Sequence, residues 1–168
     1  MQERDTKWTP IKALGKAQKE VSDWGVPDFA PDLSEKTDLE FSNLMNYDNR
    51  QLEEFLTMFG GYKAYLETKV ADIDAQLSAH EAAFNESFSK ALWNLASEYQ
   101  DSGTRKPTKD ELRGAIFTRY PALQELRRDV IDLDALKRKT SGLLNTYTTA
   151  YNTVSRVVAL RTYGGQIT

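Results

Sequence analysis

A seven-residue apolar repeat runs almost unbroken through the last third of the chain, and it limits the possible folds more than any other feature. One series of positions is Leu126, Leu133, Thr140, Tyr147, Val154 and Arg161, and the interleaved series is Leu123, Val130, Lys137, Leu144, Tyr151 and Val158. Alternate steps of three and four residues place these side chains on one face of an α-helix. Such a helix is roughly 60 Å long, too long for the core helix of a compact domain. The repeat predicts a helical hairpin or coiled coil.

A second long helix is predicted upstream, over residues 49–100. Asp48 is its expected N-cap, with Gln51 in the capping-box position. Apolar residues follow mostly at steps of three and four, from Leu52 to Tyr99. Gly60 and Gly61 interrupt this pattern and cost a helix about 2 kcal/mol relative to alanine. A kink, a break and a close helix crossing all explain them, and we favour a kink or break.

The segment between the two long helices contains turn and capping signals. Residues 101–107, DSGTRKP, form a predicted turn, and Thr108 with Glu111 is a capping box that starts a helix. The residue before a proline avoids the helical region, so Tyr120 before Pro121 predicts a boundary or kink. The last helix is predicted over 122–162. The expected fold class is therefore all-α: a long antiparallel helical hairpin or coiled coil, with a short N-terminal helix on a linker.

The N-terminal segment is predicted to form an arm. A short amphipathic helix is expected over residues 10–24, with apolar residues at helical steps: Ile11, Leu14, Val21 and Trp24. Residues 25–37 contain two prolines and several acidic residues, which predicts an extended or disordered linker. We therefore expect an N-terminal arm with an acidic linker over 1–37 and a hairpin domain over 38–168. The arm either docks on a protein partner or packs back on its own bundle.

Composition and motifs argue against membrane insertion and catalysis. There is no cysteine, mean hydropathy is −0.60, and no apolar run approaches the about 20 residues of a membrane span. The N-terminus lacks the apolar core of a secretory signal, so a cytoplasmic location is expected. The lone His80 falls on an apolar stripe, where a packed, hydrogen-bonded histidine is expected, and no phosphate-binding glycine motif is present. We expect no enzyme activity, no catalytic residue, no metal and no cofactor.

Charge is distributed unevenly along the chain. Residues 1–103 hold 10 Lys+Arg against 19 Asp+Glu, whereas residues 104–168 hold 12 against 6, and the net charge is −3. Cations beside a tyrosine suit a phosphate backbone and unpaired bases. The candidate nucleic-acid contacts are Arg105, Lys106, Lys109, Arg113, Arg119, Tyr120, Arg127 and Arg128. The same cations could instead pair with the acidic half of the chain or of a neighbour, and residues 137–139 form a weaker second cluster.

The apolar stripes predict a homo-oligomer. The stripes carry several aromatic side chains, among them Phe84, Phe88 and Trp93. Two helices alone usually cannot bury this many large side chains, so a third helix or another protomer is needed. The expected oligomer interface consists of Leu133, Leu144, Tyr147, Tyr151, Val154 and Val158.

From Tyr62 to Arg161 the chain resembles a known family. An Ala-, Leu- and aromatic-rich helix (TKVADIDAQLSAHEAAFNESFSKALWNLASEY) precedes a basic Ser-Gly turn (DSGTRK) and a long final helix (LQELRRDVIDLDALKRKTSGLLNTYTTAYNTVSRVVALR). In element order and composition this is similar to the small recombination mediator proteins of T-even-type phages. The resemblance implies binding of single-stranded DNA, oligomerisation and loading of a recombinase, in the host cytoplasm.

Two functions follow as hypotheses. The first is an oligomeric helical single-stranded-DNA-binding protein that assists recombinase loading, with a recombinase or other protein partner contacting the N-terminal arm. The second is a coiled-coil adaptor, scaffold or inhibitor protein that acts through protein–protein contacts without nucleic acid.

Overall fold

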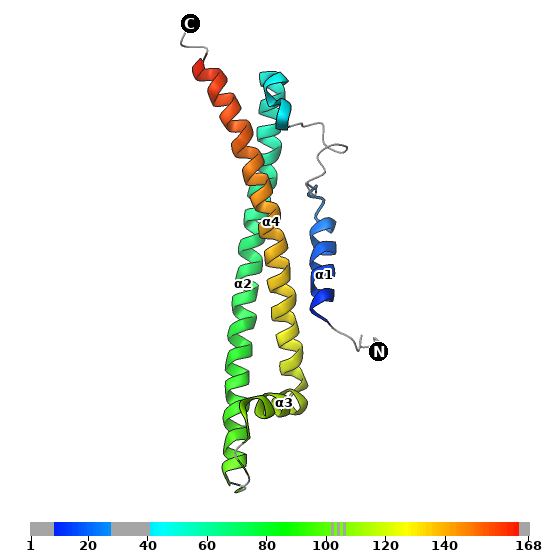
Figure 1. The fold of residues 1–168 in the computed structure, drawn as a ribbon, viewed down its shortest axis with the longest axis vertical. Coiled ribbons are helices and arrows are strands. Elements are labelled where there is room, and N and C mark those ends of the chain that lie inside the picture. The colour runs from blue at the N-terminus through cyan, green and yellow to red at the C-terminus, as the bar shows by residue number, and fades with distance from the viewer. Residues whose placement is uncertain (1–8, 28–40, 102, 104, 106, 165–168) are drawn as a thin grey trace.

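The computed structural model describes residues 9–27, 41–101, 103, 105 and 107–164, and these ranges contain helices and turns without any strand. The long helix α2 (Asn49–Asp101) packs antiparallel against the long helix α4 (Pro121–Gly164). The short helix α3 (Lys109–Arg119) lies across the turn end of this hairpin, and α1 (Pro10–Asp23) lies along α4 (Figure 1). A 3-10 helix, η1 (Phe41–Asn46), precedes α2. The predicted helical hairpin with a short N-terminal helix is confirmed.

Local side-chain chemistry sets the helix ends, as the sequence predicts. The Gln51 backbone N–H donates to Asp48 Oδ1 at 2.7 Å, and the Asp48 N–H donates to Gln51 Oε1 at 3.0 Å, which satisfies two N–H groups at the start of α2. Tyr120 leaves the helical region with φ −124° and ψ 77°. Because Pro121 restricts the residue before it, α3 ends at Arg119 and α4 begins at Pro121.

The glycine pair in α2 does not break the helix, so the break expected at this point is wrong. The helix α2 continues through Gly60 and Gly61. A Cβ atom on Gly60 would lie 3.5 Å from Cε2 of Tyr151 on α4, while nothing lies within 4 Å of the same position on Gly61. Gly60 therefore faces the Tyr151 ring on α4, and an added Cβ there would make only an ordinary van der Waals contact.

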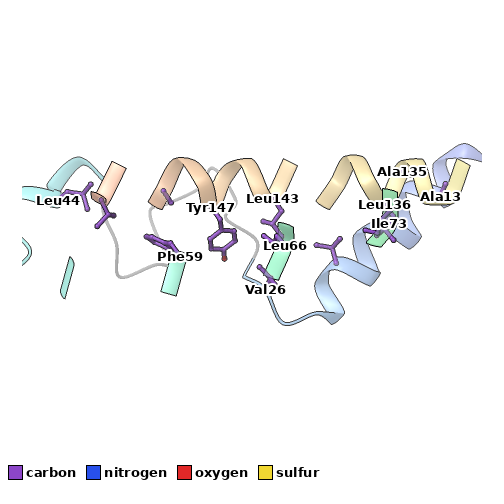
Figure 2. Close-up of a cluster of buried hydrophobic side chains, with 14 of the residues drawn as sticks. Ala13, Val26, Leu44, Phe59, Leu66, Ile73, Ala135, Leu136, Leu143 and Tyr147 are labelled. Carbon is purple, nitrogen blue, oxygen red and sulfur yellow. The ribbon is translucent and has the colours of Figure 1, made fainter. Parts of the chain in front are cut away.

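All twelve positions of the α4 repeat are buried or half-buried. The register is only partly as predicted, because the buried Leu136, Leu143 and Ala150 each lie one position before Lys137, Leu144 and Tyr151, which are half-buried. The larger of two apolar clusters joins α1, the first half of α2 and most of α4, and it contains the fully buried Phe59, Leu66, Tyr147 and Val154 (Figure 2). The smaller cluster lies at the turn end and contains Ala91, Leu95, Ile116 and Leu123.

The helix α1 packs on its own bundle, which was one of the two alternatives for the arm. It runs parallel to α4, because Lys16 Nζ lies 2.7 Å from Asp132 Oδ2 and the Tyr147 hydroxyl donates to the Pro27 carbonyl at 2.8 Å. The division into residues 1–37 and 38–168 stays a prediction. Of the linker predicted over 25–37, residues 28–37 lie outside the described residues, whereas Val26 is buried and Pro27 accepts the Tyr147 hydrogen bond.

The face that α1 buries differs from the predicted one. The buried stripe is Ala13, Ala17 and Val21, at steps of four residues, whereas Ile11 is 79% and Leu14 60% exposed. Small side chains let the α1 backbone approach α4 closely, and the larger aliphatic side chains then lie outside the contact. The expectation that Ile11 and Leu14 form the packed face is wrong for this reason.

Arg161 occupies the last position of the α4 repeat and forms hydrogen bonds that join η1 to the hairpin. Its guanidinium donates to the Met45 carbonyl at 2.8 Å and to Asn49 Oδ1 at 3.0 Å. A cation at this repeat position therefore satisfies a carbonyl at the end of η1 and a side chain at the start of α2.

No described helix has both the length and the apolar character needed to cross a membrane.

The hydrogen bond from Tyr147 to Pro27 generates a stability prediction. Tyr147→Phe removes only the hydroxyl that holds the segment after α1. A typical intramolecular hydrogen bond contributes about 0.5–1.5 kcal/mol, so we expect the free energy of unfolding to fall by about 1 kcal/mol in urea titrations. Amide exchange in α1 should accelerate in the same variant.

Tyr151→Phe is the matched control, because the structure gives no hydrogen bond for the Tyr151 hydroxyl among the described residues. Its free energy of unfolding should change by less than about 0.5 kcal/mol. Equal losses in the two variants would contradict the proposed role of the Pro27 contact.

Candidate nucleic-acid interface

The helix α3 begins with the predicted capping box. Thr108 Oγ1 accepts the Glu111 backbone N–H at 3.3 Å, and the Thr108 N–H donates to Glu111 Oε2 at 2.7 Å. Arg105 also donates to the Glu111 carboxylate, at 2.9 Å. These donors hold the pKa of Glu111 below its usual value, and the Thr108 backbone N–H has the largest effect. The cap therefore holds Arg105 beside the start of α3.

Apolar side chains fix α3 across the end of the hairpin. Ile116 is fully buried with Ala91 and Leu95 of α2 and Leu123 of α4. The half-buried Leu112 and Phe117 pack beside it, and the Phe117 ring lies 5.9 Å from the Phe88 ring. These contacts determine where the cations of α3 and of the first turns of α4 lie relative to each other.

Lys109 and Arg113 are exposed candidate cations on α3. They lie four residues apart on one side of α3, and both are exposed. Within the described part of the chain, the structure gives no ion pair for either side chain. Lys106, which the sequence groups with them, lies outside the described residues.

Arg119 forms an ion pair with a residue of the acidic half of the chain. Its Nη1 donates to Glu98 Oε2 on α2 at 2.5 Å. This hydrogen bond lowers the pKa of Glu98 and raises the pKa of Arg119. Arg119 thus ties α3 to α2, which is the intramolecular pairing that the sequence left open as an alternative.

The remaining candidate residues pack against aromatic rings or lie partly inside the fold. The Arg127 guanidinium lies 5.4 Å from the centre of the Phe117 ring, and Arg128 is half-buried with contacts of its own. Tyr120 is half-buried against the smaller apolar cluster, with the Arg119 guanidinium 5.8 Å from its ring centre. The Tyr120 ring is therefore not fully open to stacking by a base.

The weaker basic cluster at residues 137–139 is also engaged within the chain. Lys137 Nζ lies 2.5 Å from Asp74 Oδ1 on α2, and Arg138 Nε lies 2.9 Å from Asp134 Oδ2. Lys139 has an interaction partner as well. Lys137 can occupy a position of the apolar repeat because the repeat faces α2, where Asp74 pairs with its ammonium group.

The residues expected at an oligomer interface lie in this chain's own core. Tyr147 and Val154 have no exposed surface, so a second chain cannot reach them in this fold. The others, Leu133, Leu144, Tyr151 and Val158, are half-buried against the same core. The chain itself supplies cover for these aromatic residues, since the segment after α1 reaches Tyr147 through Pro27 and α3 packs with Phe84 and Phe88.

Trp93 and Arg161 are prominent in the structure in ways that the sequence interpretation missed. Trp93 was expected on an apolar stripe but is 75% exposed. Trp93 lies two residues from Ala91 and from Leu95, which places it about 200° around the helix from each of these buried residues. This spacing alone predicts that Trp93 is exposed. The hydrogen bonds of Arg161 to Met45 and Asn49 could not be predicted from neighbouring residues, because η1 and the start of α2 lie far from Arg161 in sequence.

A hollow of about 270 Å³, lined by both charged and apolar side chains, lies where α1, α2 and α4 meet. His80 borders it, and its Nδ1 lies 2.8 Å from the Gln76 carbonyl, in line with the expected hydrogen-bonded histidine. Among the described residues no group of three or more His, Cys, Asp or Glu side chains is arranged to hold a metal ion.

In comparisons with known proteins, no family model, no curated protein and no solved structure matches this chain.

The bond between Glu98 and Arg119 makes stability depend on pH. Because the pKa of Glu98 is lower in the folded chain, the stabilisation is complete above about pH 4.5 and is lost as the pH falls through the folded pKa. Glu98→Gln should therefore lower the melting temperature at about pH 7 and change it little at about pH 2.5. Thermal unfolding followed by circular dichroism at both pH values measures this.

Glu81→Gln is the control, since Glu81 lies on the same helix, is exposed, and has no ion pair among the described residues. It should leave both melting temperatures unchanged. A loss for Glu98→Gln of the same size at both pH values would show that the carboxylate charge is not responsible.

Proposed function

We propose that this chain is an oligomeric helical protein that binds single-stranded DNA at the turn end of its hairpin and assists recombinase loading. One observation supports this above others. Because α3 folds across the turn, six candidate cations lie at the same end of a long rod: Arg105, Lys109, Arg113, Arg119, Arg127 and Arg128 (Figure 1). A group of cations at one end of a molecule with a net charge of −3 suits a local polyanion contact.

The ion pairs at this end do not prevent phosphate binding. Arg105 and Glu111 have side chains that are 77% and 52% exposed, and Arg119 and Glu98 are also exposed. Exposed pairs contribute little to stability, because water solvates both partners well. A phosphate group can therefore replace the carboxylate as the partner of either arginine, while Lys109 and Arg113 bind without first losing a partner.

The N-terminal arm is the proposed contact for the recombinase. The helix α1 presents Ile11 and Leu14 to solvent, and aliphatic side chains on an exposed helix face suit a protein surface. The proposed setting is the cytoplasm, in keeping with the cysteine-free composition.

The DNA-binding proposal predicts a loss of phosphate contacts when Lys109 and Arg113 are both replaced by alanine. Each phosphate neutralised on a single strand contributes roughly −0.7 to the slope of log affinity against log salt. The double variant should bind a labelled oligonucleotide more weakly and with a slope shallower by roughly 1.4. Fluorescence anisotropy at several salt concentrations measures both changes.

Lys19→Ala combined with Arg156→Ala is the matched control. Both side chains are exposed cations outside α3, and the structure gives no ion pair for them among the described residues. This variant has the same net charge as the α3 variant and should retain wild-type binding. Similar losses in both variants would mean that net charge, rather than the turn end, determines the affinity.

A second candidate is the adaptor or scaffold function, and Trp93 favours it. Tryptophan is enriched at protein interfaces, and Trp93 is 75% exposed beside the partly exposed Leu92 on the part of α2 that α1 does not cover. At the opposite end of the rod Leu160 and Tyr163 are also exposed. Such a rod can hold protein chains through apolar contacts along its length.

The adaptor hypothesis predicts that Trp93→Ala weakens association of the chain with itself without lowering its stability, because the side chain lies outside the core. Sedimentation velocity over a range of concentrations measures the association. Tyr163→Ala, at the far end of the hairpin, is the control. Under this hypothesis the wild-type chain binds no DNA even at low salt, so DNA binding together with an unchanged mass for Trp93→Ala would exclude it.

A further inference from the structure

The helix α2 carries an exposed stripe without charged residues. We call it the outer face of α2, defined by the twelve positions that alternate in steps of four and three residues from Thr57 to Ala96. All twelve are exposed and none is charged, although charged residues make up 28% of the chain. Exposed helix positions normally hold many charged side chains. An uncharged stripe about 60 Å long on a water-exposed helix is therefore unlike an ordinary solvated surface.

No described helix covers the outer face. Among the described helices only α4 and α3 pack along α2, whereas α1 packs along α4 (Figure 1). Gly61, near the start of the face, has nothing within 4 Å of an added Cβ atom. Large apolar side chains are exposed near both ends, with Met58 next to the first position and Leu92 and Trp93 near the last. The outer face is accessible to another molecule and has apolar side chains at each end.

The residues of the outer face suit close contact with a second helix. Gly61, Ala71 and Ala82 are small, and small side chains let two helix axes approach to about 8 Å. The hydroxyls of Thr57 and Thr68 each donate to the carbonyl four residues earlier in the same helix, at 2.9 and 3.1 Å. Both hydroxyls therefore keep a hydrogen-bond partner when water is removed from the face.

We propose that the outer face of α2 is a dimer interface, on which a second copy of this chain packs its own outer face in the antiparallel direction. Steps that alternate between four and three read the same from either end, so a two-fold axis near Gln76 pairs positions that lie equally far from it. This pairing sets Gly61, which has no side chain, opposite Leu92, the largest residue of the face, and it brings Met58 beside Trp93. A parallel pair would instead set Gly61 against the same glycine and leave a gap.

Charge also favours the antiparallel direction. A parallel pair would bring the two basic turn ends together, whereas an antiparallel pair separates them by the length of the hairpin. Three of the acidic residues that border the outer face already have lysine partners within their own chain: Glu67, Asp74 and Glu86. Repulsion between the acidic edges of two copies is reduced for this reason.

The outer face is large enough for a specific dimer. A helix contact about 60 Å long and about 10 Å wide buries roughly 600 Å² of each chain, or roughly 1,200 Å² in total. This area reaches the lower bound of specific, stable interfaces, about 1,200 Å².

This inference rests on the oligomeric part of the proposed function and not on DNA binding. It places the assembly on α2, since Tyr147 and Val154 of α4 are closed to a second chain. DNA affinity enters none of the measurements below, so failure of the dimer and failure of the DNA proposal are distinguishable.

Single cysteines test the pairing, because the chain has no cysteine of its own. The proposed dimer sets Ala71 of one copy opposite Ala82 of the other, at a separation that a disulfide can bridge. An oxidised equimolar mixture of Ala71→Cys and Ala82→Cys should give a mixed disulfide-linked dimer, in at least about tenfold higher yield than either variant alone. Mass spectrometry under non-reducing conditions measures the linked species.

A charge placed on the outer face tests the interface without a cysteine. Ala75→Glu should keep the wild-type melting temperature because Ala75 is exposed in the single chain. In the dimer the new carboxylate is buried against the second copy, so the dissociation constant should rise at least about tenfold in sedimentation velocity. Ala159→Glu is the control, since it makes the same charge change at an exposed position of α4, and it should leave the dissociation constant unchanged.

Three results would overturn the proposal. In the first, the mixture links no better than Ala71→Cys mixed with Ala159→Cys. In the second, each cysteine variant links to itself as well as the mixture does, which is the pattern of a parallel pair. In the third, the wild-type chain is a monomer, which also removes the oligomeric part of the proposed function, whereas an oligomer without the mixed disulfide removes only the α2 interface.

Discussion

The packing of α4 against α2 is the contact on which the docking of both shorter helices depends. Phe59 and Leu66 of α2 meet Tyr147 and Val154 of α4, and all four side chains are fully buried. Burying side chains of this size contributes about 1.5–3 kcal/mol each. The helix α1 packs along α4, and α3 rests on α2 and the start of α4, so both shorter helices dock on the hairpin.

Sequence reasoning succeeded where one local rule governs the structure. One series of the α4 repeat, Thr140, Tyr147 and Val154, lies in the core, because residues seven apart return to the same face of a helix. Asp48 with Gln51 and Thr108 with Glu111 act within a few residues, so their caps can be predicted without knowledge of the fold. The same holds for the boundary at Pro121.

The same reasoning was wrong where tertiary packing outweighs local preference. On α1 the alanines are buried and Ile11 and Leu14 exposed, because the distance between two helix axes, rather than residue hydrophobicity, determines what fits there. The helix α2 continues through Gly60, which faces Tyr151 of α4, and this neighbour is far from Gly60 in sequence. Trp93 was predicted on the apolar stripe because it is aromatic. Its spacing from Leu95 instead places it on the opposite side of the helix.

The sequence predicts which cations make up the candidate DNA interface, but not which of them form ion pairs within the chain. A count of charges identifies the basic segment, yet it does not show that Arg119 binds Glu98, which lies twenty-one residues earlier, or that Lys137 binds Asp74. These pairs depend on the antiparallel arrangement of α2 with α3 and α4. Geometry therefore divides the predicted set into accessible cations, such as Lys109 and Arg113, and cations that also hold the helices together.

The two apolar clusters have a mechanical consequence for the hairpin. The larger reaches Ile73 on α2 and Ile131 on α4, while the smaller surrounds Ile116. The hollow beside His80 and Asp129 borders the larger cluster, since Leu133 and Leu136 line it. A ligand at the turn end contacts only the elements of the smaller cluster, so we expect it to slow the local opening of that cluster first.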